Sequence, residues 1–121
     1  MTINEYQKDV LRTESQAIET CITDSRLLQG LLGLSGEAGE CVEILKKHLF
    51  QAHWFDREQL AKELGDVAFY LALSADAIGY SFEDILQMNV DKRQKRYPQG
   101  FDIDRSIHRP EYEGGTNHAP D

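Results

Sequence analysis

Apolar side chains recur at intervals of three and four along the middle of the chain, a spacing that predicts two long helices. The first runs from residue 24 or 25 to about residue 50. Its apolar stripe contains Leu27, Leu28, Leu31, Leu32, Leu34, Ala38, Cys41, Val42, Leu45 and Leu49. The second spans 56–78, with Asp56 as its N-cap and Gly79 as its stop. Its predicted core positions are Leu60, Leu64, Val67, Ala68, Leu71, Ala72 and Ala75.

Two further helices are predicted on either side of this pair. Thr2 and Glu5 have the spacing of a capping box, which indicates a helix from about residue 4 to residue 20. Ser81 begins a fourth helix that ends near Arg96, because a following Tyr-Pro pair disfavours further helix. No strand-like alternation is present, so the predicted fold is an all-α, four-helix bundle.

The chain of 121 residues suits a single domain. After Phe101 the sequence is mostly polar, so we expect an extended or disordered tail, with Phe101 and Ile103 docked on the bundle. The predicted domain therefore covers 1–103 and the tail covers 104–121. A core this small makes burial against a second subunit attractive.

Four glycines recur at intervals of three in the first long helix. They are Gly30, Gly33, Gly36 and Gly39. Each costs about 0.5–1 kcal/mol relative to alanine inside a helix, so their number needs a reason. One explanation is close helix packing or a break near Ser35, and the other is backbone left open for a ligand. The sequence leaves both open.

The net charge of −8 and pI of about 4.9 argue against binding duplex DNA or an anionic membrane by bulk electrostatics. They do not exclude a nucleotide whose phosphates are masked by a metal ion. Cys21 and Cys41 are too few for a disulfide framework and are expected to act as small hydrophobic residues. The N-terminus lacks a signal segment and no run of about eighteen apolar residues occurs, so we expect a soluble cytoplasmic protein.

Two pairs of acidic residues are the strongest indication of chemistry. Glu37 and Glu40 lie in one predicted helix, and Glu63 and Asp66 lie in the next. Residues three apart share a helix face, so side-by-side packing would bring four carboxylates together. Such a cluster needs protonation, a cationic side chain or a divalent cation, and the scarcity of basic neighbours favours a cation that takes oxygen ligands. The sequence therefore predicts a magnesium site.

Acidic pairs and histidines also occur in other settings. Pairs of this kind are often only surface charge, but these acids lie at the margin of apolar stripes, where unneutralised charge is costly. A ferritin-like di-iron site would need Glu-x-x-His, which is absent, as are phosphate-loop and Cys-x-x-Cys motifs. The four histidines fall at a helix end, in a loop and in the tail, and are expected to be exposed polar residues.

A basic cluster ends the fourth helix. Lys92 and Arg96 are four residues apart and share a helix face. They either complement the helix dipole or hold a polyphosphate.

Three segments together resemble a known family. They are Gly33-Leu-Ser-Gly-Glu37-Ala-Gly-Glu40, Lys62-Glu63-Leu-Gly-Asp66-Val-Ala-Phe-Tyr70, and Asn89 to Phe101 with its Arg96-Tyr97-Pro98. The chain resembles the MazG-type, all-α nucleoside triphosphate pyrophosphohydrolases from about residue 6 to residue 101. The combination is specific, although each segment alone is weak.

The resemblance implies Mg²⁺-dependent hydrolysis of a nucleoside triphosphate to monophosphate and pyrophosphate, with Mn²⁺ as a possible substitute. The implied metal ligands are Glu37, Glu40, Glu63 and Asp66, and the implied phosphate or nucleotide contacts are Lys47, Asn89 and Lys92. Arg96 and Tyr97 match the family's ending and are added as candidate substrate contacts. Either Glu37 or Glu40 would accept the proton of the attacking water. The resemblance also implies a homodimer or homotetramer.

Two alternatives remain beside this function. The chain would otherwise be a non-catalytic, metal-binding helical interaction module, or a pyrophosphohydrolase acting on another nucleotide-like metabolite. Base preference is undecided, and the aromatic candidates for it are Tyr6, Trp54, Phe55, Phe69 and Tyr70.

Overall fold

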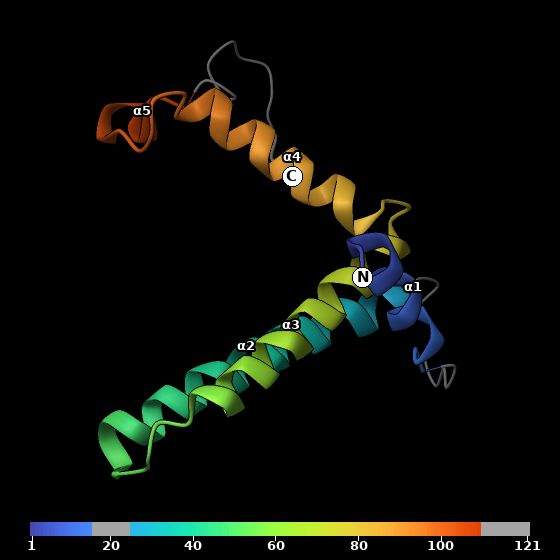
Figure 1. Cartoon of the computed structure of the whole chain (residues 1–121), viewed down its shortest axis with the longest axis vertical. Helices are drawn as coiled ribbons and strands as arrows, with labels where there is room; N and C mark the ends of the chain where they lie inside the picture. Colours follow the sequence, from blue (N-terminus) through green and yellow to red (C-terminus); the bar gives the residue numbers. More distant parts are fainter. Residues whose placement is uncertain (16–24, 110–121) are drawn as a thin grey trace. The chain divides into compact units, whose positions relative to one another are not determined.

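The computed structural model describes residues 1–15 and 25–109, and the chain divides into two compact units, Met1–Phe82 and Glu83–Asp121. Its helices are α1 (Ile3–Arg12), α2 (Ser25–Gln51), α3 (Arg57–Ala77), α4 (Phe82–Arg96) and α5 (Ile103–Ile107) (Figure 1). No strand occurs among the described residues, and the all-α prediction is confirmed. None of the helices in these ranges is long and apolar enough to cross a membrane.

Helices α2 and α3 form an antiparallel pair joined by residues 52–56 (Figure 1). Asp56 caps α3 as predicted, because its carboxylate accepts the N–H groups of Glu58 and Gln59 at 3.0 and 3.1 Å. Gly79, with a φ of +84°, follows the end of α3 as predicted. Helix α2 is continuous, so the break considered near Ser35 does not occur.

Helix α1 begins as predicted but ends earlier. The capping box is present, with Glu5 N donating to Thr2 Oγ1 at 3.1 Å and Thr2 N donating to the Glu5 carboxylate at 2.6 Å. The predicted extension beyond Arg12 is wrong for residues 13–15. Thr13 ends the helix because its N–H and its hydroxyl both return to the Val10 carbonyl. Residues 16–20 of that prediction, and Cys21, lie outside the described residues.

A buried glutamine fastens α1 to α3. Gln7 Nε2 donates to the carbonyls of Ala72 and Tyr80 at 3.2 and 3.3 Å, and its Oε1 accepts Phe82 N at 3.0 Å. The adjoining core contains Val10, Ala72 and Leu73, with Tyr6, Leu11, Phe69, Tyr70 and Phe82 packed against it. Since a buried polar group must be hydrogen-bonded to be tolerated, Gln7 sets the position of α1 along α3.

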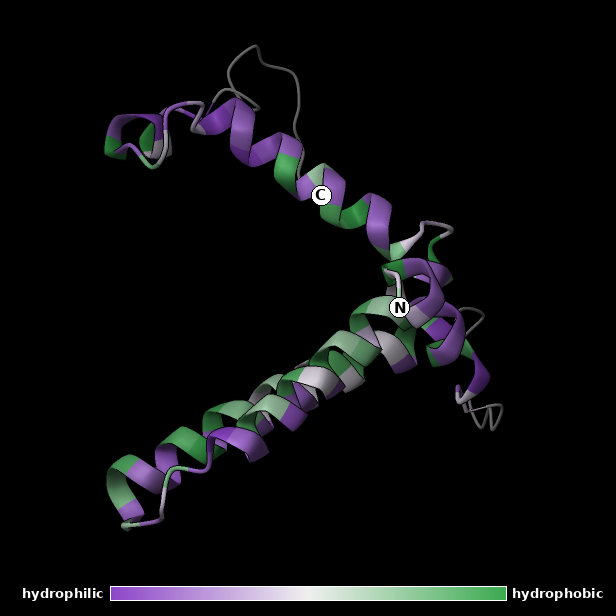
Figure 2. Ribbon diagram, viewed as in Figure 1, coloured by the Kyte–Doolittle hydropathy of each residue, from purple (hydrophilic) through white to green (hydrophobic). Residues whose placement is uncertain are grey.

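Much of the apolar surface of the α2–α3 pair remains exposed. Leu64 and Leu71, predicted as core, are 55% and 39% exposed, because α1 packs on a different side of α3. Helix α2 also exposes apolar side chains, namely Leu31, Leu32, Val42, Leu45 and Leu49. Figure 2 shows hydrophobic residues along both helices. The predicted core stripes are therefore only partly buried within the unit Met1–Phe82.

The C-terminal unit contains a short helix where an extended tail was expected. That prediction is wrong for Ile103–Ile107, because Asp102 caps α5 by accepting Arg105 N at 3.0 Å. Arg105 in turn donates through Nε to the Arg96 carbonyl at the end of α4, at 2.6 Å. Phe101 is 75% exposed, and its docking on the bundle stays a prediction, as does that of Ile103. The predicted tail beyond Arg109 lies outside the described residues.

Candidate functional site

Two glycines allow α2 and α3 to approach each other closely. A Cβ placed on Gly30 would lie 2.3 Å from Ser74 Oγ, and one on Gly33 would lie 2.2–2.4 Å from atoms of the Tyr70 ring. At Gly36 and Gly39 a Cβ would meet nothing within 4 Å. The two explanations for the glycines therefore apply to different residues, since the first pair serves packing and the second pair borders open space.

One turn after Gly33, this approach brings carboxylates of the two helices together. Glu37 of α2 lies with Glu63 and Asp66 of α3, and one oxygen from each falls within 4.8 Å of the others. Glu37 and Glu63 are half-buried and Asp66 is exposed. Three of the four predicted ligands are thus gathered on one face of the α2–α3 pair.

The ionised form of Glu37 is disfavoured in this cluster. Its pKa is raised, first by desolvation, then by a hydrogen bond with Glu63 and by the negative charges of Asp66, Glu63 and Glu40. Each cause makes the ionised form of Glu37 less favourable when no cation is present. A cation bound at the cluster would therefore stabilise the ionised form of Glu37.

The raised pKa of Glu37 predicts how the metal-free protein responds to pH. A carboxyl whose pKa is raised on folding contributes its full stability below its ordinary pKa, and loses it as pH rises through the raised value. We expect Glu37→Gln, in the presence of EDTA, to unfold at a higher temperature than wild type near pH 8, with the difference shrinking near pH 4. Thermal unfolding followed by circular dichroism checks this, and an equal difference at both pH values would contradict it.

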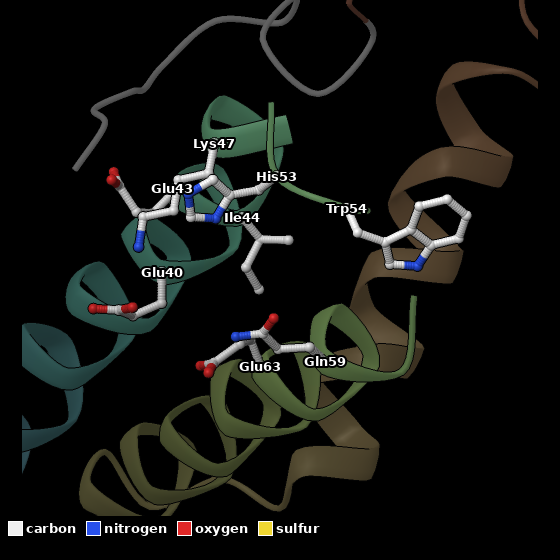
Figure 3. A pocket seen from close by; sticks show the side chains of 8 residues that line it. All are labelled: Glu40, Glu43, Ile44, Lys47, His53, Trp54, Gln59 and Glu63. Carbon is white, nitrogen blue, oxygen red and sulfur yellow. The ribbon is translucent and has the colours of Figure 1, made fainter. Parts of the chain in front are cut away.

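Glu40 lies next to this cluster, not within the group of three. It lines a small polar hollow of about 120 Å³, together with Lys47 and Glu63. Glu63 belongs both to this hollow and to the three-carboxylate cluster. Figure 3 shows the other lining residues, which are Glu43, Ile44, His53, Trp54 and Gln59. Glu40 is exposed and close enough to raise the pKa of Glu37. Glu40 and Glu63 therefore border the hollow at the end nearest the three-carboxylate cluster, and the Lys47 ammonium group borders it about two turns further along α2 (Figure 3).

Internal contacts hold the connection between α2 and α3 in place. His53 N donates to the Lys47 carbonyl at 3.2 Å, and His48 Nδ1 lies 2.9 Å from the His53 carbonyl. The His48 ring also packs at 5.4 Å from that of Phe55. Trp54 remains 90% exposed beside the hollow. A defined loop thus presents an indole at the edge of the candidate site.

Four lining residues were not named from the sequence as site residues. They are Glu43, Ile44, His53 and Gln59. A signal existed for Glu43, because positions 40, 43 and 47 share a face of α2. Gln59 lies four residues before Glu63 and shares its face of α3. His53 joins the hollow from the connection between the helices, which no helical period predicts.

The remaining candidates lie in the C-terminal unit, in α4 or directly after it. Asn89 Oδ1 accepts Arg93 Nε at 2.9 Å. Lys92 and Arg96, one turn apart in α4, share a face as predicted. The Arg96 guanidinium lies 5.8 Å from the centre of the Tyr97 ring, which packs at 5.2 Å from Phe101. This end of α4 therefore combines cationic and aromatic groups.

The residues of the acidic cluster fit a hard divalent cation. Carboxylate oxygens are the ligands that Mg²⁺ prefers, and it normally completes its shell with water and substrate phosphates. Glu37, Glu63 and Asp66 offer such oxygens from two helices held at fixed separation. No other group of three acidic, histidine or cysteine ligands that could hold a metal is found among residues 1–15 and 25–109.

Comparison with known proteins agrees with this geometry. The MazG nucleotide pyrophosphohydrolase domain matches residues 26–101, which include α2, α3 and α4. The Gene 37 protein of Mycobacterium phage L5 is 32% identical over 108 residues, covering 83% of this chain and 92% of the phage protein. No solved structure gives a significant match. The chain therefore belongs to the MazG nucleotide pyrophosphohydrolase family.

Proposed function

We propose that the protein hydrolyses a nucleoside or deoxynucleoside triphosphate to the monophosphate and pyrophosphate, with Mg²⁺ as cofactor and Mn²⁺ as a substitute. The observation that carries this is the meeting of Glu37, Glu63 and Asp66 beside a hollow that Lys47 lines. An acidic metal site next to a cationic side chain suits a polyphosphate, whose charge both can neutralise. The role would be cleaning or control of the nucleotide pool in the cytoplasm.

The proposed roles follow from position and charge. Glu37, Glu63 and Asp66 hold the cation, which when bound neutralises phosphate charge and makes water a better nucleophile at neutral pH. Glu40, exposed at the boundary between cluster and hollow, accepts the proton of the attacking water. Lys47 contacts the phosphates. Asn89, Lys92, Arg96 and Tyr97 are proposed as further substrate contacts.

The reaction needs no covalent intermediate with the protein. A water oxygen attacks the α-phosphorus, and the bond from this phosphorus to the oxygen that bridges to the β-phosphate breaks. The water proton passes to a carboxylate, and the bridging oxygen leaves as part of pyrophosphate. Carboxylates and a lysine are sufficient for these steps once a divalent cation is bound.

The direct test is an incubation with Mg²⁺ and a panel of canonical and modified nucleoside triphosphates, with products separated by chromatography. Monophosphate plus pyrophosphate from part of the panel supports the proposal and reveals the base preference. Diphosphate plus phosphate, or no turnover of any substrate, would refute it. Trp54, exposed at the edge of the hollow, is the first aromatic to examine for base contact.

Two other functions would give different results. A non-catalytic helical module would bind the cation but would show no metal-dependent affinity for a non-hydrolysable nucleotide analogue in calorimetry. A pyrophosphohydrolase for another nucleotide-like metabolite would be inactive on the panel but would release a phosphomonoester from such a compound. The lysine-lined hollow next to the acidic cluster favours nucleotide hydrolysis over the first of these.

We also propose that the protein is a homodimer or homotetramer. Leu31, Val42, Leu45 and Leu49 recur along one side of α2 and are 47–66% exposed, and Leu64 and Leu71 add to this surface from α3. An apolar surface spread over two helices commonly marks a protein–protein interface. A second copy of the pair would complete a bundle by covering it.

The interface makes a prediction about oligomeric state. We expect the wild type to have at least twice the 13.8 kDa mass of one chain in light scattering, and Val42→Glu to have the mass of a single chain, because a buried carboxylate there would be unpaired. Lys62→Glu, on the opposite side of α3 at a 75%-exposed side chain, should leave the mass unchanged. A monomeric wild type would contradict the proposal.

A further inference from the structure

One side chain of α1 reaches the part of α3 that carries the acidic cluster. The Tyr6 hydroxyl donates to the carbonyl of Gly65 at 3.4 Å. Gly65 lies between Glu63 and Asp66, two of the three gathered carboxylates. The ring of Tyr6 packs against the core formed by Val10, Ala72 and Leu73. Tyr6 therefore joins the core to the backbone of the candidate metal site.

Several hydrogen bonds fix the part of α1 that contains Tyr6. Its neighbour Gln7 is 7% exposed and makes three hydrogen bonds to backbone groups of residues 72–82. The capping box fixes the turn of α1 that contains Tyr6. The Tyr6 hydroxyl therefore extends from a helical turn that these hydrogen bonds hold in place. Proximity to Asp66 contributes to the raised pKa of Tyr6, after the larger effect of burial, and agrees with this placement.

Gly65 is the position of α3 whose backbone gains most from the Tyr6 hydrogen bond. A glycine inside a helix costs about 0.5–1 kcal/mol relative to alanine and leaves the backbone freer to move. Close packing does not explain it, because a Cβ there would meet nothing within 4 Å. The site thus contains a glycine with no packing role between two candidate ligands, with a hydrogen bond from another helix on its carbonyl.

We propose that Tyr6 is a positioning residue that steadies the backbone at Gly65, and so holds Asp66 in register with Glu37 and Glu63 for a divalent cation. This rests on the proposed metal-dependent function. Residues that orient the ligands of a metal ion without touching the ion commonly change metal affinity by about 10–100-fold when mutated. Because Tyr6 acts through the main chain, we expect about a three- to tenfold effect.

The test is the affinity for Mn²⁺ alone, measured by the loss of the free-ion signal in electron paramagnetic resonance. Tyr6→Phe removes only the hydroxyl, so we expect about three- to tenfold weaker binding with an unfolding temperature close to that of wild type. Tyr80→Phe is the matched control, because Tyr80 meets α1 through its backbone carbonyl, and it should bind like wild type. Unchanged affinity in Tyr6→Phe, with wild type binding normally, would overturn the inference.

A rescue separates positioning from other effects. Gly65→Ala fits the open space and stiffens α3. In the Tyr6→Phe background it should restore much of the lost affinity, while having little effect in wild type. No recovery would overturn the positioning role. Absence of Mn²⁺ binding in wild type would instead refute the metal site, and the two failures are therefore distinguishable.

Discussion

Glu40→Gln is expected to lower turnover by about 10²–10⁴-fold, the usual contribution of a general base. Glu40 is exposed and lies outside the group of three carboxylates, so its amide should leave the fold intact and most of the metal affinity in place. The substitution removes the proton acceptor beside the hollow while keeping the size of the side chain. Steady-state assays at saturating Mg²⁺, with circular dichroism on the same samples, measure both effects.

Glu43→Gln is the matched control for this substitution. Glu43 lines the same hollow, lies one turn further along α2, and pairs with Lys46 at 3.1 Å. A surface ion pair of this kind contributes little, about 0–1 kcal/mol, so stability should hardly change. Turnover within a few-fold of wild type is expected. Activity retained in Glu40→Gln, or lost equally in both variants, would remove Glu40 from its proposed role.

Gly33→Ala is expected to have the largest effect on stability. The added methyl group would lie 2.2–2.4 Å from the Tyr70 ring, which is itself packed edge-on against Phe69 at 5.1 Å. Overpacking of this kind usually costs about 1–3 kcal/mol, more than the 0.5–1 kcal/mol that alanine gains as a helix former. Because Glu37 follows one turn later, separation of the helices should also weaken metal binding. Urea unfolding and Mn²⁺ titration measure the two consequences.

The same substitution three residues further along should have the opposite sign. A Cβ on Gly36 would meet nothing within 4 Å, so Gly36→Ala should stabilise the protein by about 0.5–1 kcal/mol. Opposite signs in the two variants would tie Gly33 to interhelical contact. A similar gain in both would show that α2 and α3 do not approach closely at Gly33.

The sequence was sufficient for features that depend on local periodicity. The capping box, the bounds of α2 and α3 and the shared faces of the acidic pairs follow from spacing along one helix. The gathering of Glu37 with Glu63 and Asp66 also requires α2 and α3 to align in register, which depends on Gly30 and Gly33 meeting Ser74 and Tyr70. Spacing alone does not distinguish the four glycines of α2. The register of α2 against α3 does, because a Cβ would meet close neighbours only at Gly30 and Gly33.

Other features depend on competing hydrogen bonds, or on which segments cover a surface. The apolar periodicity predicts neither. Helix α1 ends at Arg12 because the side chain of Thr13 takes a helical carbonyl, a local alternative to further helix. Leu64 and Leu71 have the same periodicity as buried residues, but burial depends on which side α1 occupies. Glu40 has the spacing of a ligand, yet it borders the hollow because the 52–56 connection and the N-terminal turn of α3 complete that space.

Gln7 gives the protein an order of assembly. Its partners lie 65–75 residues further along the chain, so none of its three hydrogen bonds can form before residue 72 has been made, and all three require residue 82. Helix α1 leaves the ribosome before α2 and α3, but a ten-residue helix is only marginally stable alone in water. It must therefore wait for the α2–α3 hairpin, whose contacts are more local and form sooner. Helix α1 is thus synthesised before the α2–α3 pair but secured after it.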